Sequence, residues 1–195
     1  MGAQRRLQYF AYGSNMLTCR LRERVPSASP IGVGRLKGYV LRWDKRSKLD
    51  GSGKCDAEAT GRLRDSVWGV LFALKASEKH ALDRAEGLGN GYVERRVAII
   101  LGEEGTRAVT YIATDKRPSL KPYHWYKALV VAGAREHRLP QHYIRRLLRT
   151  RFVRDPDSVR AEENLRMLVM AQSTKRQSTK RHQRGRNGKG SYRAA

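Results

Sequence analysis

The segment at positions 8–16, QYFAYGSNM, constrains the fold more than any other part of the chain. It starts with apolar and aromatic residues typical of a buried strand, and it breaks at Gly13, Ser14 and Asn15 before a helix-compatible segment. A strand that ends this way places backbone N–H groups and the positive end of a helix dipole at its carboxyl edge, which favours a carboxylate or a developing oxyanion. Gly13 would let a ligand approach the backbone closely, because it has no Cβ. The alternative interpretation is a strand followed by a polar turn, with Asn15 as the N-cap of the helix.

A second informative stretch is LDRAEGLGNG at positions 82–91. A helix is expected to end at Glu86, because Gly87 suits a left-handed C-cap. The negative end of the helix dipole would raise the pKa of a carboxylate held there above the ordinary value of about 4.3, as a general base requires. On this pattern alone a residue such as Glu86 is more often a solvated residue at a helix end than a base, and Asp83 and Glu94 are equal rivals for the role.

Length and charge favour one basic domain with a tail. The chain has 195 residues and a net charge of +23. We expect a single domain at 1–172 and a disordered tail at 173–195, where eight basic residues occur without an acidic one. The domain alone keeps a charge of +15, which could bind nucleic acid non-specifically or steer anionic substrates to a cleft.

Several classes of protein are disfavoured. Two cysteines make neither a disulfide framework nor a metal site, and the five histidines lack ligand spacing. No apolar run has the length of a membrane span, and the N-terminus has no signal-peptide core. We therefore expect a soluble, cytoplasmic protein that needs no metal. The three tryptophans are interpreted as core residues.

Hydrophobic periodicity predicts a mixture of strands and helices. Strands are expected at 7–12, 31–43, 57–63, 67–74, 92–101 and 107–114. The third and fourth should form a hairpin, and 44–55 should be a loop. Helices are expected before Pro26 and at 77–85, 121–138, 140–148 and 158–171, the second of them capped by Ser77. This order favours an α+β fold with a largely antiparallel or mixed sheet.

Three motifs in this order resemble the gamma-glutamylcyclotransferase family, which has an AIG2-like fold. They are the YGSN sequence that starts at Tyr12, the LDRAEG sequence that ends at Gly87, and Tyr126. The resemblance extends over about 7–150 and implies a small mixed, mostly antiparallel β-barrel with surrounding helices. It also implies that Glu86 is the catalytic residue. The substrate-binding residues that it implies are Tyr9, Phe10, Ala11, Tyr12, Gly13, Ser14, Asn15 and Tyr126.

The resemblance implies an acyl-transfer reaction without metal or cofactor. The α-amine of a small γ-glutamyl substrate would attack its own γ-carbonyl and release 5-oxoproline with an amino acid or amine. Glu86 would be the general acid and base, and Tyr126 would steady either the glutamyl group or Glu86. The leaving group is left open among amino acids, a lysine side chain, glutathione and natural-product amines, although Asn15 favours the general over the glutathione-specific branch. A homodimer is also left open.

The alternative function is a non-catalytic cyclotransferase-like fold. Such a protein would bind nucleic acid or another polyanion through its basic surface and tail.

Overall fold

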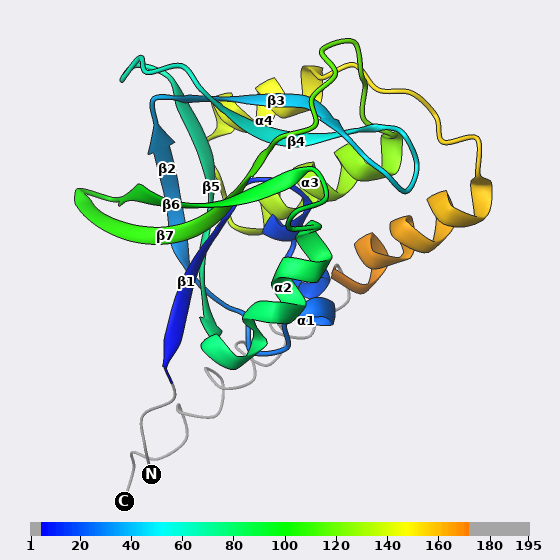
Figure 1. The fold of residues 1–195 in the computed structure, drawn as a ribbon. Coiled ribbons are helices and arrows are strands. Elements are labelled where there is room, and N and C mark those ends of the chain that lie inside the picture. The colour runs from blue at the N-terminus through cyan, green and yellow to red at the C-terminus, as the bar shows by residue number, and fades with distance from the viewer. Residues whose placement is uncertain (1–4, 172–195) are drawn as a thin grey trace, which may run out of the picture.

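A closed barrel of five strands forms the centre of the computed structural model. The structure describes residues 5–171, and the tail predicted at 173–195 lies outside this range. The strand order is β1-β5-β2-β6-β7 (Figure 1). Neighbouring strands run antiparallel, except that β1 and β7 run parallel where they meet at Tyr9 and Val109. This architecture confirms the predicted mixed, mostly antiparallel barrel. The strands are β1 (Arg6–Ala11), β2 (Ser29–Lys37), β5 (Ser66–Lys75), β6 (Tyr92–Leu101) and β7 (Glu104–Ala113).

Strand β1 lies between two neighbours in the barrel, as its apolar sequence predicts. Tyr9 pairs with Phe72 of β5 and also with β7, so both edges of the strand have partners. Phe10 and Ala11 are almost completely buried. Because β1 is fixed along its length, the turn that follows it is held at one mouth of the barrel.

Strands β3 (Tyr39–Arg46) and β4 (Gly53–Ala59) form a separate antiparallel pair that crosses one end of the barrel (Figure 1). The prediction of one strand over 31–43 is wrong, because the chain turns between β2 and β3 at Gly38, which has a φ of +80°. A positive φ is strained for residues with a Cβ and is readily adopted by glycine. The predicted loop at 44–55 is also shorter than expected, because β3 and β4 extend into it from both sides.

The predicted hairpin of 57–63 with 67–74 is wrong. Strand β4 pairs with β3, whereas β5 pairs with β1 and β2. The two connections meet at Gly38, whose N–H donates to the carbonyl of Asp65 and whose carbonyl accepts from the N–H of Thr60. The chain thus leaves the barrel after β2 and returns to it before β5 at the same corner.

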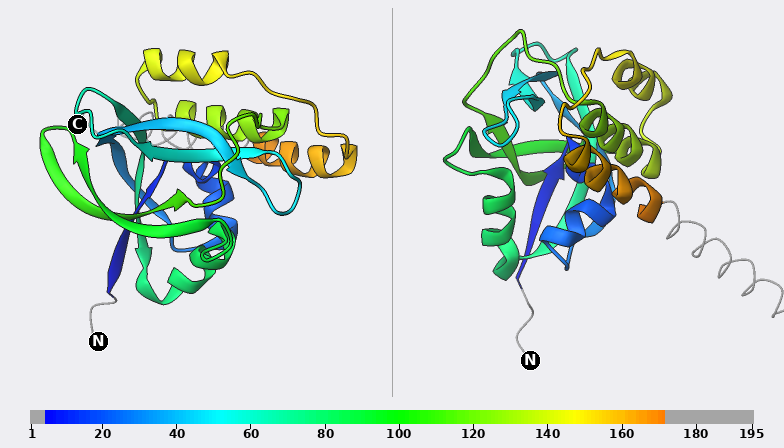
Figure 2. Two further views of the ribbon diagram at one scale, coloured as in Figure 1. Left: turned by 45° about the horizontal axis from the view of Figure 1, so that its top comes forward. Right: turned by 90° about the vertical axis from the view of Figure 1, so that its right-hand side faces the viewer.

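Helices pack around the barrel at the positions that the sequence predicts. Figure 2 (right) shows α2 on one side of β1, and α1, α3 and the helix at 158–171 on the other. Among the described residues, no helix is long and apolar enough to cross a membrane. The helices are α1 (Thr18–Arg24), α2 (Lys79–Glu86), α3 (His124–Glu136), α4 (Gln141–Arg149) and the helix at 158–171, with short 3₁₀ helices at Ser14–Met16 and Ala76–Glu78.

Two predicted helix caps are wrong. Ser77 lies inside the 3₁₀ helix that precedes α2, and Glu78 takes the N-cap position. Asn15 lies inside the 3₁₀ helix at Ser14–Met16, and Leu17 precedes α1 at the N-cap. The side chain of Asn15 is therefore available for other contacts.

Candidate active site

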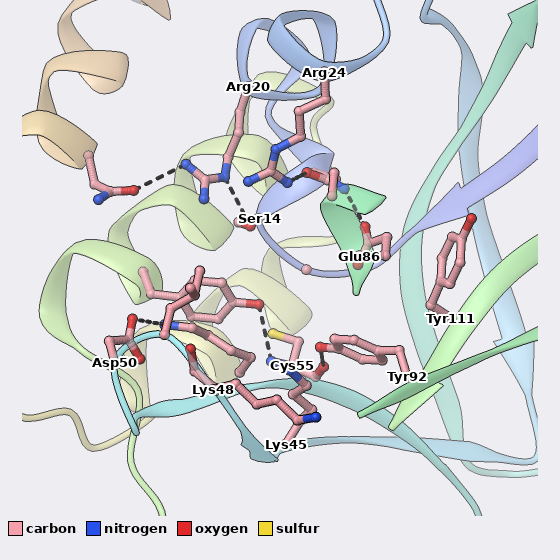
Figure 3. A pocket seen from close by; sticks show the side chains of 18 of the residues that line it. Ser14, Arg20, Arg24, Lys45, Lys48, Asp50, Cys55, Glu86, Tyr92 and Tyr111 are labelled. Carbon is pink, nitrogen blue, oxygen red and sulfur yellow. Dashed lines mark hydrogen bonds and ion pairs between the residues drawn. The ribbon is translucent and has the colours of Figure 1, made fainter. Parts of the chain in front are cut away.

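A cavity of about 510 Å³ opens where the end of β1, the end of α2, the β3–β4 pair and α3 meet. It brings together the first and second of the sequence motifs and Tyr126, which are far apart along the chain. Figure 3 shows its polar side chains pointing toward a common space. The lining includes Tyr9, Tyr12, Gly13, Ser14, Asn15, Arg20, Arg24, Lys45, Lys48, Asp50, Lys54, Cys55, Glu86, Tyr92, Tyr111 and Tyr126.

Glu86 is the last residue of α2, and the helix end that carries it is fixed. Gly87 has a φ of +68° and a ψ of +47°, which confirms the predicted left-handed cap. The N–H of Gly87 donates to the carbonyl of Arg84, and the N–H of Leu88 donates to the carbonyl of Asp83. These bonds satisfy carbonyls that a helix end leaves without partners, so the backbone beneath Glu86 is ordered.

Two side chains hold the carboxylate of Glu86. The hydroxyl of Tyr9 donates a hydrogen bond of 2.8 Å to Oε1 of Glu86, and Nδ2 of Asn15 donates to the same oxygen. Oδ1 of Asn15 accepts a bond of 2.7 Å from Arg24. Asn15 thus joins the carboxylate to a guanidinium group, which fixes the orientation of all three side chains.

Burial raises the pKa of Glu86 above its ordinary value. The charges of Arg24, Arg20 and Lys45 and the hydrogen bond from Tyr9 lower it, yet the desolvation of the carboxylate outweighs them. The sequence predicted the direction of this shift from the helix dipole, whereas the structure attributes it to burial. A carboxylate with a raised pKa is suited to accept and return a proton near neutral pH.

The turn after β1 is built from buried residues. Gly13 precedes the 3₁₀ helix at Ser14–Met16, and Ser14 and Asn15 are both buried. Nε of Arg20 donates a bond of 3.2 Å to Oγ of Ser14. The first N–H groups of a helical turn have no partner within the turn, so this segment can present donors to a ligand in the cavity.

The other predicted binding residues divide into two groups. Tyr12 and Tyr126 line the cavity, whereas Phe10 and Ala11 are not among the lining residues. The Tyr126 hydroxyl accepts a bond of 3.1 Å from the N–H of Cys55. The hydroxyl that contacts Glu86 is therefore that of Tyr9, and Tyr126 lies elsewhere on the cavity wall.

Basic residues are the part of the site that sequence reasoning missed. The lining contains seven Lys and Arg side chains against the acids Asp50 and Glu86. Arg20 and Arg24 are four residues apart in α1 and so lie on one face of the helix, a spacing that could have identified them. Lys45 offered no such signal, because it falls in a segment predicted as a loop.

The cavity contains a cysteine that is unsuited to nucleophilic attack. Cys55 is buried, and burial raises the pKa of its thiol to about 12, so the thiol stays protonated at neutral pH. Among residues 5–171, no group of three or more His, Cys, Asp or Glu side chains could hold a metal ion. The position and raised pKa of Glu86 are suited to proton transfer on a substrate that carries its own nucleophile.

Comparisons with known proteins agree with this geometry. Residues 66–147 match the model of the AIG2-like family. Gamma-glutamylcyclotransferases from Homo sapiens and Mus musculus are each 34% identical to the chain in an alignment of 149 positions that covers 71% of this chain and 76% of theirs. A solved structure of a gamma-glutamyl cyclotransferase is 30% identical and superposes with a TM-score of 0.71 over 76% of this chain and 90% of its own. A solved structure of a yeast gamma-glutamyl cyclotransferase specific to glutathione, at 12% identity and a TM-score of 0.56, has the same fold.

Proposed function

This chain belongs to the gamma-glutamylcyclotransferase family and is an enzyme of that type, and we propose that the cavity around Glu86 is its active site. One observation carries this proposal: Tyr9 and Asn15 hold the carboxylate of Glu86 at the wall of the cavity, and burial raises its pKa. The substrate is a γ-glutamyl amide with a free α-amino group.

The reaction needs no nucleophile from the protein. The α-ammonium of the substrate gives a proton to Glu86, and the resulting amine attacks the γ-carbonyl carbon. A carbon–nitrogen bond forms within the glutamyl group as the bond to the leaving amine breaks. Glu86 gives that proton to the leaving nitrogen as its bond breaks, then takes the remaining extra proton from the new ring nitrogen and passes it to the released amine, so that the products are 5-oxoproline and the protonated amine. Intramolecular attack benefits from effective molarities on the order of 10⁵ M or more when the chain is held curled.

The turn after β1 supplies the electrostatic part of the reaction. Backbone N–H groups at Gly13 and Ser14 are suited to bind the α-carboxylate or the oxygen of the γ-carbonyl as negative charge develops on it. The hydroxyl of Tyr126 can donate to the glutamyl group while it accepts from Cys55. Proton transfer by one positioned carboxylate contributes about 10²- to 10⁴-fold to the rate.

Replacement of Glu86 by Gln separates catalysis from binding. Gln has nearly the same shape, yet it cannot take up the proton, so turnover should be lost while a γ-glutamyl substrate still binds in calorimetry. Loss of binding and turnover to the same degree would make Glu86 a structural residue and contradict the proposal.

Location and further partners are separate proposals. The two free cysteines among the described residues support a reducing compartment such as the cytoplasm. The basic tail at 173–195 is suited to contact nucleic acid or another polyanion. A salt titration of binding by the full chain and by residues 1–172 tests the second proposal, because an accessory tail predicts that binding is lost on truncation.

A further inference from the structure

Lys45 is a buried cation that the proposed reaction does not use. It belongs to β3 and is 7% exposed, and its Nζ lies 4.6 Å from the centre of the Tyr92 ring. Within residues 5–171, no side chain or carbonyl accepts a hydrogen bond from this Nζ and no carboxylate pairs with it. Figure 3 shows it on the cavity wall, across the pocket from Arg20 and Arg24. A buried charge without a partner costs free energy, so its position calls for an anion that comes from outside.

Three other cations of the cavity also form no ion pair with a carboxylate among the described residues, although Lys48 is exposed. Arg20 donates to Ser14 and to Asn164, and Arg24 donates to Asn15, all of which are neutral. Lys48 likewise donates to the neutral side chain of Asn90, at 3.1 Å.

Two cations of the same cavity are paired and form a useful contrast. Lys54 forms an ion pair of 2.8 Å with Asp50, and Arg160 pairs with Asp155. Because Lys54 already pairs with Asp50, Glu86 is the acid of the lining that remains to oppose most of the charge of Arg20, Arg24, Lys45 and Lys48. The cavity is built to receive more than one negative charge.

The glutamyl part of a substrate can satisfy one side of this cavity. Its α-carboxylate is attached to the same carbon as the α-amine, which must reach Glu86. That carboxylate is thus held near Asn15, on the side where Arg20 and Arg24 lie. The leaving nitrogen also reaches Glu86 when the glutamyl chain is curled, and its substituents point away from the glutamyl group. The space that remains for them is on the side of Lys45, across the pocket from Arg20 and Arg24 (Figure 3).

We propose that Lys45, with Lys48 at its side, forms an anion subsite for the leaving group, so that the enzyme prefers γ-glutamyl amides of acidic amino acids. The proposal rests on the function proposed for the cavity. It makes Lys45 a residue that determines specificity and leaves proton transfer to Glu86. A side-chain carboxylate on the leaving amino acid would replace water around the ammonium group and form a charge-assisted hydrogen bond.

The test compares two substrates of nearly equal shape, γ-glutamyl-glutamate and γ-glutamyl-glutamine, which differ by one negative charge. Release of 5-oxoproline gives kcat/KM for each. We expect the wild type to prefer the glutamate substrate by about tenfold, the usual effect of a hydrogen bond to a charged group. The γ-glutamyl amide of a diamine, whose leaving group is a cation, should be the poorest substrate.

The variant Lys45→Met keeps the apolar stem and removes the charge. We expect the preference for γ-glutamyl-glutamate to fall to within about threefold of unity. The readout is the ratio of kcat/KM for the two substrates, measured with the same variant. Lys45 also lowers the pKa of Glu86, and the effect of its loss on proton transfer cancels in this ratio. Lys37→Met, which removes an exposed lysine outside the cavity, should keep the wild-type preference. Thermal unfolding should show no loss of stability in Lys45→Met, because the change removes a buried unpaired charge.

The outcomes distinguish the anion subsite at Lys45 from the function proposed for the whole cavity. Equal kcat/KM for the two substrates in the wild type, or the same preference in Lys45→Met as in the wild type, would overturn the anion subsite and leave the reaction intact. No release of 5-oxoproline from any substrate would contradict the proposed function of the cavity, and the subsite with it.

Discussion

The hydroxyl of Tyr9 donates a hydrogen bond of 2.8 Å to Glu86, which is 77 positions away along the chain. This bond joins strand β1 of the barrel to the capped end of α2. Burial raises the pKa of the Tyr9 hydroxyl well above its usual range, so the hydroxyl keeps its proton and remains a donor. Glu86 is therefore oriented by a rigid element rather than by its own helix alone.

The pH dependence of the reaction should report the raised pKa of Glu86. The carboxylate must be ionised to accept the proton, so kcat/KM should fall as the pH drops through a pKa above the usual value of about 4.3. The measurement is 5-oxoproline release as a function of pH with a γ-glutamyl dipeptide. An acidic limb at or below the pKa of an exposed glutamate would contradict the assignment.

Tyr9→Phe removes the hydroxyl and leaves the ring. The bond from Tyr9 lowers the pKa of Glu86, so its loss should move the acidic limb of kcat/KM to higher pH. The free energy of unfolding should fall by about 1 kcal/mol, which urea denaturation can measure. Tyr39→Phe alters a tyrosine outside the cavity and should leave the limb where it is. An identical pH profile in both variants would show that the bond does not tune Glu86.

Gly13→Val tests the close approach of substrate to the turn after β1. A Cβ at this position would lie 3.1 Å from the hydroxyl of Tyr126 and 3.3 Å from Cβ of Cys55, and the two methyl groups need more room still. A shift of about 1 Å in the cavity wall should lower kcat/KM by about 10²-fold. Gly105→Val is the matched control, because a Cβ there meets no heavy atom within 4 Å. Unchanged kinetics in Gly13→Val would remove this turn from the substrate site.

Cys55→Ala should retain most of the turnover. The thiol has a pKa of about 12, so the enzyme cannot depend on a thiolate at neutral pH. We expect a loss of about 1 kcal/mol in the free energy of unfolding for the truncation of a buried side chain, with kcat changed by less than about threefold. A loss of activity as large as that of Glu86→Gln, in a protein that still folds, would indicate a covalent mechanism instead.

Local patterns were sufficient for the parts of the site that depend on neighbouring residues. The apolar run before Tyr12 predicted β1, and Gly87 predicted the left-handed end of α2 because both signals depend on a few adjacent positions. The motifs also pointed to Glu86 and Tyr126, which the structure finds in one cavity.

The remainder depends on contacts between distant segments, which no local pattern specifies. Asn15 fits an N-cap by residue type, yet its side chain bridges Glu86 and Arg24. The pairing of β5 with β1 and β2 depends on closure of the barrel and on the corner at Gly38. The local sequence contains neither signal, and for this reason it favoured a hairpin of 57–63 with 67–74 that does not form. Lys45 enters the cavity only because β3 crosses the barrel end.

The most direct measurement is 5-oxoproline release from γ-glutamyl dipeptides, γ-glutamyl-lysine and glutathione by the wild type and by Glu86→Gln. We expect release by the wild type and a loss of about 10²- to 10⁴-fold or more in Glu86→Gln. Glu104→Gln, which removes an exposed carboxylate, should retain wild-type rates. The Glu86→Gln protein should unfold at the same temperature or higher, because burial disfavours the charge that the substitution removes. Wild-type rates in Glu86→Gln would show that this carboxylate does not move the protons.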